Sequence, residues 1–113
     1  MWLMTKHGFY SIVEKKPGEF HVRSRERRDL ENLVERVPLS EEEILDTPSH
    51  DYAVRLIVDA SVVRQILVFL AETLDYDNFK GRIDQTSDQR HKPYHEIWDI
   101  MYEALGGYGR PGK

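Results

Sequence analysis

The sequence predicts an α+β fold, a two-layer sandwich in which helices pack on one face of an antiparallel sheet of about three to five strands. Apolar and polar residues alternate over 19–24 and 52–58, which is the period of half-buried strands. Over 61–74 and 93–105 the apolar residues recur every three or four positions, as in amphipathic helices. The segment order departs from βαββαβ, so we expect a ferredoxin-like general appearance with the strand order left open.

The first two predicted strands are separated by a tight turn. Residues 1–14 are rich in strand-forming side chains, and Gly8 interrupts them. This interruption allows either two short strands or one bent strand. Pro17 presets its φ and Gly18 can adopt a positive φ, so residues 19–24 should return antiparallel to the preceding strand.

A helix over 25–36 should follow directly. Ser24 is a residue type that caps helix N-termini, and Pro38 ends the helical pattern. Ser40 and Glu43 then have the spacing of a capping box. A further short helical turn is therefore expected at that point.

The next segment predicts a central strand over 52–58 and then a second helix. Asp59 and Ser61 are both suitable caps, and the apolar stripe continues to Leu74. Because few of its residues are strongly polar, we expect this to be the main core helix. A short helical turn should follow near Phe79.

The last predicted element is a third helix with the most regular periodicity in the chain. Residues 84–92 are wholly polar and are expected to form a loop. Pro93 suits the first turn of a helix, and Gly106 should end it. We expect a single domain over 1–106 and a flexible tail over 107–113.

Composition narrows the classes of function. The 113 residues include no cysteine, which excludes disulfides, thiolate nucleophiles and thiolate metal sites. A net charge of −4 disfavours nucleic-acid binding through overall charge, but a local basic patch stays possible. We see no secretion signal and no apolar run long enough for a bilayer, so we expect a cytoplasmic protein with no membrane contact.

The strand–helix junction carries a cluster of arginines. Arg23, Arg25 and Arg28 lie close to the expected helix N-terminus, where forked guanidiniums and free backbone N–H groups suit a phosphate or carboxylate. Lys80 and His95 are added to this anion-binding candidate. The competing interpretation is a solvated face, because several carboxylates lie nearby in the sequence to form salt bridges.

His95 is also the only plausible acid–base group. Asp99 lies four residues after it on the same predicted helix, and Glu96 is adjacent. Pro93 places His91 before the helix, so the pattern is not the two-histidine zinc motif. We therefore assign no catalytic residue and expect no metal and no cofactor.

Five aromatic residues fall on the predicted strands. They could stack on bases, as in sheet-based RNA binders, or pack into the core. The glycine and aromatic signature of such RNA binders is absent, which favours the core. The five are Trp2, Phe9, Tyr10, Phe20 and Tyr52.

The opening MWLMTKHGFYSIV, the junction VRSRERRDLENL, the segment DYDNFK and the helix YHEIWDIMY resemble a family of short uncharacterised bacterial proteins. The resemblance spans most of the chain. It implies a small bacterial cytoplasmic protein and assigns no activity.

Three hypotheses of function follow. The first is a non-enzymatic binding or regulatory module with a protein partner, which could be a second copy in a homodimer. The second is binding of RNA, a nucleotide or another anion by Arg23, Arg25 and Arg28. The third is a small hydrolase or transferase that uses His95 with Asp99 or Glu96.

Overall fold

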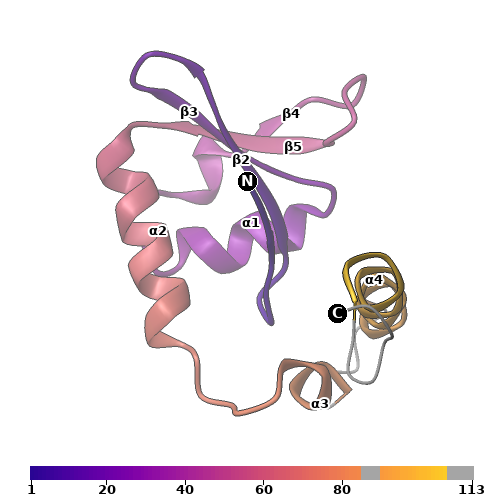
Figure 1. The fold of residues 1–113 in the computed structure, drawn as a ribbon. Helices are drawn as coiled ribbons and strands as arrows, with labels where there is room; N and C mark the ends of the chain where they lie inside the picture. The colour runs from indigo at the N-terminus through magenta and orange to yellow at the C-terminus, as the bar shows by residue number, and fades with distance from the viewer. Residues whose placement is uncertain (85–89, 107–113) are drawn as a thin grey trace. The chain divides into compact units, whose positions relative to one another are not determined.

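Five strands form one antiparallel sheet, as the alternating segments predict (Figure 1). The computed structural model describes residues 1–84 and 90–106, and the strand order is β1-β2-β3-β5-β4. Helices cover one face of the sheet, so the two-layer α+β prediction is confirmed. The strands are β1 (Trp2–Met4), β2 (Phe9–Lys16), β3 (Glu19–Ser24), β4 (Leu45–Asp46) and β5 (Val54–Val58).

The chain divides into two units, Met1–Asp75 and Tyr76–Lys113. The first holds the sheet, α1 (Arg27–Val34), the 3-10 turn η1 (Glu41–Glu43) and α2 (Ala60–Glu72). The second holds α3 (Phe79–Asp84) and α4 (His91–Leu105). The single domain over 1–106 stays a prediction, and the tail over 107–113 lies outside the described residues.

The interruption at Gly8 separates two strands rather than bending one. β1 and β2 pair antiparallel, and the Thr5 N–H donates to the Gly8 carbonyl across the turn at 3.0 Å. A Cβ on Gly8 would lie 2.6 Å from the Cβ of Asp29, so the close approach of α1 requires glycine here. The turn before β3 also forms as predicted, with Gly18 at φ +80°.

Ser24 was predicted to cap the first helix, and this is wrong. Ser24 is the last residue of β3 and pairs with Val54, so its backbone belongs to the sheet. Its buried hydroxyl donates to the Phe9 carbonyl at 3.1 Å. The N-cap is Glu26, and α1 is shorter than the predicted 25–36 because the strand continues further along the chain.

The expected capping box is present. The Ser40 N–H donates to Glu43 Oε2 at 2.7 Å, and η1 follows. The short strand β4 was not predicted, because two residues are too few to show alternation.

Apolar side chains on one side of the sheet, here called the inner face, pack against the helices. α1 packs on β3 and β5, and α2 packs on β3. The Tyr10 hydroxyl donates to the Asp29 carbonyl of α1 at 2.7 Å, which satisfies its buried O–H. The core cluster contains Tyr10, Ile12, Val22, Leu30, Leu33, Val34, Ile44, Val54, Leu56, Val58 and Ile66.

α2 begins at the predicted cap but is not the main core helix. The Asp59 side chain accepts from the Val62 N–H at 3.1 Å. Only Ile66 of α2 is buried, and Val68 of α2 and Leu74, which follows the helix, are more than half exposed. α1 packs on both β3 and β5 and buries Leu30, Leu33 and Val34, whereas Val62, Val63, Phe69 and Leu70 of α2 pack against the core while only partly buried.

The described residues of the second unit form two helices, as predicted, with one boundary changed. α4 begins at His91 rather than at Pro93, so His91 lies inside the helix and Pro93 in its first turn. Gly106 ends the helix at φ +94°. Of the polar loop predicted over 84–92, residues 85–89 lie outside the described part of the chain.

Within that unit, aromatic side chains of α3 and α4 contact one another. The rings of Phe79 and Tyr94 stack with centroids 5.8 Å apart. Lys80 Nζ lies 4.3 Å from the centroid of Trp98. Across the described residues, no helix has both the length and the apolar character needed to cross a bilayer.

Candidate functional site

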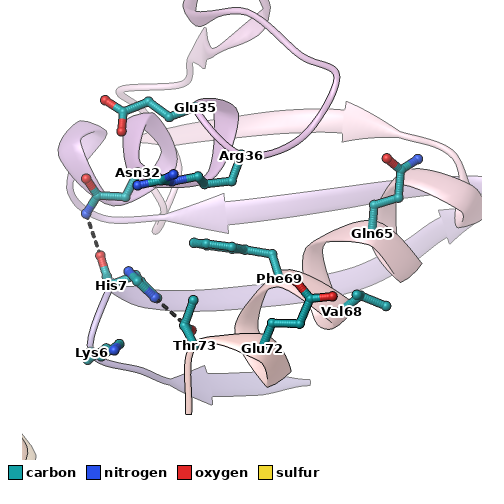
Figure 2. A pocket seen from close by; sticks show the side chains of 10 residues that line it. All are labelled: Lys6, His7, Asn32, Glu35, Arg36, Gln65, Val68, Phe69, Glu72 and Thr73. Atoms are coloured by element: carbon teal, nitrogen blue, oxygen red, sulfur yellow. Dashed lines mark hydrogen bonds between the residues drawn. The ribbon is translucent and has the colours of Figure 1, made fainter. Parts of the chain in front are cut away.

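Two places in the first unit gather polar side chains. One is a groove of about 810 Å³ between α1 and α2, closed at one end by the turn between β1 and β2 (Figure 2). The other is the face of the sheet opposite the helices. The groove is lined by Lys6, His7, Asn32, Glu35, Arg36, Gln65, Val68, Phe69, Glu72 and Thr73.

The hydrogen-bonded polar groups around His7 in the groove serve the fold. The Thr73 hydroxyl donates to the Leu70 carbonyl at 2.9 Å, so it accepts from His7 Nε2–H at 3.0 Å. The His7 carbonyl accepts from Asn32 Nδ2 at 2.7 Å, and its ring lies 4.8 Å from that of Phe69 (Figure 2). His7 therefore joins the β1–β2 turn to both helices.

The charges of the groove cancel. Lys6 Nζ contacts Asp75 Oδ1 at 2.8 Å, with the lysine side chain largely buried. Among the lining residues themselves, the two cations Lys6 and Arg36 are matched in number by the two carboxylates of Glu35 and Glu72. The groove therefore has no net charge that would select an anion or a cation.

The opposite side of the sheet, here called the outer face, is different. Directly paired residues on antiparallel strands project to the same side, so the register identifies its central row. No helix of Met1–Asp75 covers this row, and the side chain at its β1 end, Trp2, is 74% exposed. The row runs across all five strands through Trp2, Ser11, Arg23, Arg55 and Leu45.

Arg55 is the most buried cation of the outer face, with 7% of its surface exposed. Its Nη1 donates to His21 Nδ1 at 3.0 Å, and its Nη2 donates to His50 Nδ1 at 3.3 Å. A guanidinium only donates, so both imidazoles accept through Nδ1. His21 therefore carries its proton on Nε2, which donates to Glu19 Oε2 at 3.1 Å.

Arg23 lies directly beside Arg55 on the neighbouring strand. Its Nη2 donates to Ser11 Oγ at 2.7 Å, whereas its buried Nε has no hydrogen-bond partner among the described residues. Like charges in directly opposed positions destabilise a sheet, and an unsatisfied buried donor costs about 1–3 kcal/mol. The pair therefore works against the stability of the fold.

Tyr52 holds two arginines at the edge of this face. The guanidinium carbons of Arg23 and Arg25 each lie 4.7 Å from the centroid of its ring. Arg25 Nη1 also donates to the Asp51 carbonyl at 3.3 Å. Tyr52 is buried by these contacts in the loop before β5, so it is neither a strand residue nor a free stacking platform.

The three arginines are not neutralised. Within the described residues, no carboxylate lies within 4.0 Å of the guanidinium of Arg23, Arg25 or Arg55. Arg27 shows the contrast, because it contacts Glu31 at 3.6 Å and Asp46 at 3.4 Å. The outer face is therefore a concentration of positive charge on an acidic chain.

The structure brings together only part of the predicted anion site. Arg23 and Arg25 converge on Tyr52, but Arg28 belongs to α1, which covers the opposite side of the sheet. Lys80 and His95 belong to the second unit, and their part in the site stays a prediction. Of the strand aromatics, Tyr10 is in the core as predicted, whereas Trp2 is exposed.

Sequence reasoning missed Arg55. The alternation over 52–58 did place it on the side of the strand away from Leu56, and that was the available signal. A charged residue at such a position is normally solvated, so its burial by His21 and His50 could not be expected.

The acid–base candidate gains no support from α4. Asp99 and Glu96 are exposed, and His95 is half-buried. In the described part of the chain, no group of three or more His, Asp or Glu side chains could hold a metal ion.

Comparison with protein families, with curated proteins and with solved structures finds no match to this chain. The function therefore has to be inferred from the residues themselves. The expectations of a protein partner and of a homodimer stay predictions.

Proposed function

We propose that the protein is a non-enzymatic binding module whose outer face binds an anionic ligand. The observation that supports this is the pair formed by Arg23 and Arg55, directly opposed on β3 and β5 with no carboxylate of the described residues within 4.0 Å. Arg25 adds a third guanidinium through Tyr52.

Two buried or half-buried cations side by side cost the free protein stability, because each loses hydration and each repels the other. A bound anion removes both penalties. It can pair with the half-buried guanidinium of Arg23 and screen the repulsion between the two arginines. An arrangement that destabilises the free protein and favours the complex is typical of a binding site.

The neutral partners of Arg55 support the same proposal. His21, His50 and Thr47 hold the guanidinium by accepting its N–H groups without cancelling its charge. A carboxylate in any of these positions would position the guanidinium equally well but would neutralise it. The surroundings therefore orient Arg55 and preserve its charge.

Calorimetric titration with inorganic tripolyphosphate at low salt tests the proposal. We expect wild-type binding, and we expect Arg23→Gln to weaken it at least about tenfold, because one charged hydrogen bond contributes about 1.5–3 kcal/mol. Arg27→Gln is the matched control, since it removes one arginine that already has carboxylate partners.

The control should bind as the wild type does. If the wild type fails to bind tripolyphosphate, or if both variants lose affinity equally, the outer face is not an anion site. Arg55→Gln provides a second check, and circular dichroism should confirm that each variant remains folded.

A further inference from the structure

We infer that the anionic ligand of the outer face is single-stranded nucleic acid, with a base stacked on Trp2 and phosphates at Arg23 and Arg55. This inference rests on the proposed function and adds the class of ligand. The observation that carries it is the shared cross-strand row, which places an exposed indole and two guanidiniums on the same side of one sheet.

The spacing along the row suits an extended ligand. Neighbouring strands lie about 4.8 Å apart, so Trp2 on β1 is about 10 Å from Arg23 on β3 and about 14 Å from Arg55 on β5. A single strand crossing the sheet would therefore have its base at one end of the row and its phosphates at the other. Ser11 and Arg55 of the row are buried, but Ile57 is 48% and Leu45 44% exposed on the same face. Exposed side chains spread over two strands suit an extended ligand better than a small anion.

The indole of Trp2 is available for stacking. The Phe9 ring meets it in an edge-to-face contact, with centroids 6.3 Å apart and planes inclined by 60°. Phe9 thus supports Trp2 without covering it, and 74% of Trp2 remains exposed. A large exposed aromatic on a cationic face fits a base, because every base offers a flat π-surface beside a negatively charged backbone.

The exposed ring of Trp2 favours a nucleic acid over an acidic peptide, and the number of guanidiniums limits the affinity for the nucleic acid. The carboxylates of an acidic peptide would pair with the arginines, but these side chains carry no ring that could stack on the indole of Trp2. With three guanidiniums available, a single strand can neutralise at most about three phosphates, so the logarithm of the binding constant should fall with the logarithm of salt with a slope near −2.

Tryptophan fluorescence gives a direct test, because the chain has only two tryptophans. In the full chain carrying Trp98→Phe, Trp2 is the sole reporter, and the substitution keeps an aromatic ring beside Tyr102. We expect oligouridylate or oligothymidylate of about eight nucleotides to quench Trp2 fluorescence on binding. Tripolyphosphate should bind the same face with little quenching.

Trp2→Ala is the decisive variant, and the exposure of Trp2 predicts that the protein still folds. Its affinity for a labelled oligonucleotide, measured by fluorescence anisotropy, should fall about fivefold or more. Its affinity for tripolyphosphate should not change. Arg23→Gln should weaken the binding of both ligands.

The outcomes separate this inference from the proposed function. If tripolyphosphate binding depends on Arg23 while oligonucleotide binding is absent or indifferent to Trp2→Ala, the ligand class is wrong and the anion site stands. If polyglutamate of equal charge binds as tightly as the oligonucleotide and quenches Trp2 equally, the partner is an acidic protein segment. If neither tripolyphosphate nor oligonucleotide binds, both proposals fail.

Discussion

The two faces of the sheet are built from alternate residues of the same strands, yet they have opposite character. On β5, Val54, Leu56 and Val58 enter the inner face and pack with the helices. Between them, Arg55 and Ile57 point to the outer face. One strand thus contributes apolar contacts to the core and a charged group to the candidate site.

This difference suggests a division in a small fold: the residues that stabilise it lie on the inner face, and the residues of the candidate site lie on the outer face. The inner face removes apolar surface from water, which is the main favourable contribution to folding. The outer face keeps like charges together and an indole in solvent, both of which disfavour the free protein. Substitutions on the inner face should therefore change stability, whereas most substitutions on the outer face should change binding.

The largest expected effect is on the inner face. Leu56→Ala removes a fully buried side chain beneath the helices and should lower the free energy of unfolding by about 2–5 kcal/mol. Ile57→Ala, one residue further along β5, removes a side chain that is 48% exposed and should cost at most about 1 kcal/mol. Urea denaturation of both variants gives the comparison.

The pair is informative because the two residues share a strand and differ mainly in the face they occupy. Equal losses of stability would mean that the outer face is also buried, either by the second unit or by another copy of the chain. That result would remove the basis for treating it as a binding surface.

A smaller effect is expected at Asp29, which joins α1 to β2, a strand that contributes side chains to both faces of the sheet. Its buried Oδ2 accepts from the Phe9 N–H at 3.0 Å. Asp29→Ala leaves this N–H without its acceptor and should lower the free energy of unfolding by about 1–3 kcal/mol. The measurement is again the urea midpoint and slope.

Asp29→Asn is the matched control, because an amide oxygen can still accept from Phe9. It should lose clearly less stability than the alanine variant. If the two variants were equally unstable, the contribution of Asp29 would come from its charge rather than from this hydrogen bond.

The sequence predicted the inner face much better than the outer one, and the reason is physical. Periodicity reports which residues avoid water, so it correctly predicted the helices over 61–74 and 93–105 and the sheet they accompany. It overestimated the burial of α2, because a helical stripe does not show which other helix competes for the same sheet face.

The candidate site depends on partners that are distant in the sequence. Arg23 and Arg25 were predicted because they are neighbours in the chain, and Arg28 was included for the same reason. Arg55 was missed because its pairing with Arg23 arises only from the β3–β5 register. Local spacing cannot predict such a pair, nor can it show that Ser24 remains in the sheet instead of capping α1.

The smallest expected effect concerns the cap of α2, a helix that contributes to the cover of the inner face. The Ser61 hydroxyl donates to Asp59 Oδ1 at 2.6 Å, and this bond, followed by that from the Val62 N–H, lowers the pKa of Asp59 below its usual 3.8. A lowered pKa in the folded state means that the ionised carboxylate stabilises the fold. This contribution is fully present above the unfolded-state pKa and disappears as the pH falls through the folded-state pKa.

Asp59→Asn should therefore lower the thermal midpoint slightly at pH 7 and make no difference at a pH well below 3.8. Asp51→Asn makes the same change of charge at an exposed residue that does not cap α2, so its midpoint should follow the wild type at both pH values. A loss in Asp59→Asn that persists undiminished in acid would mean that the ionised carboxylate is not what stabilises the start of α2. Because the cap is fully exposed and its helix only partly covers the core, this loss should remain below those at Leu56 and Asp29.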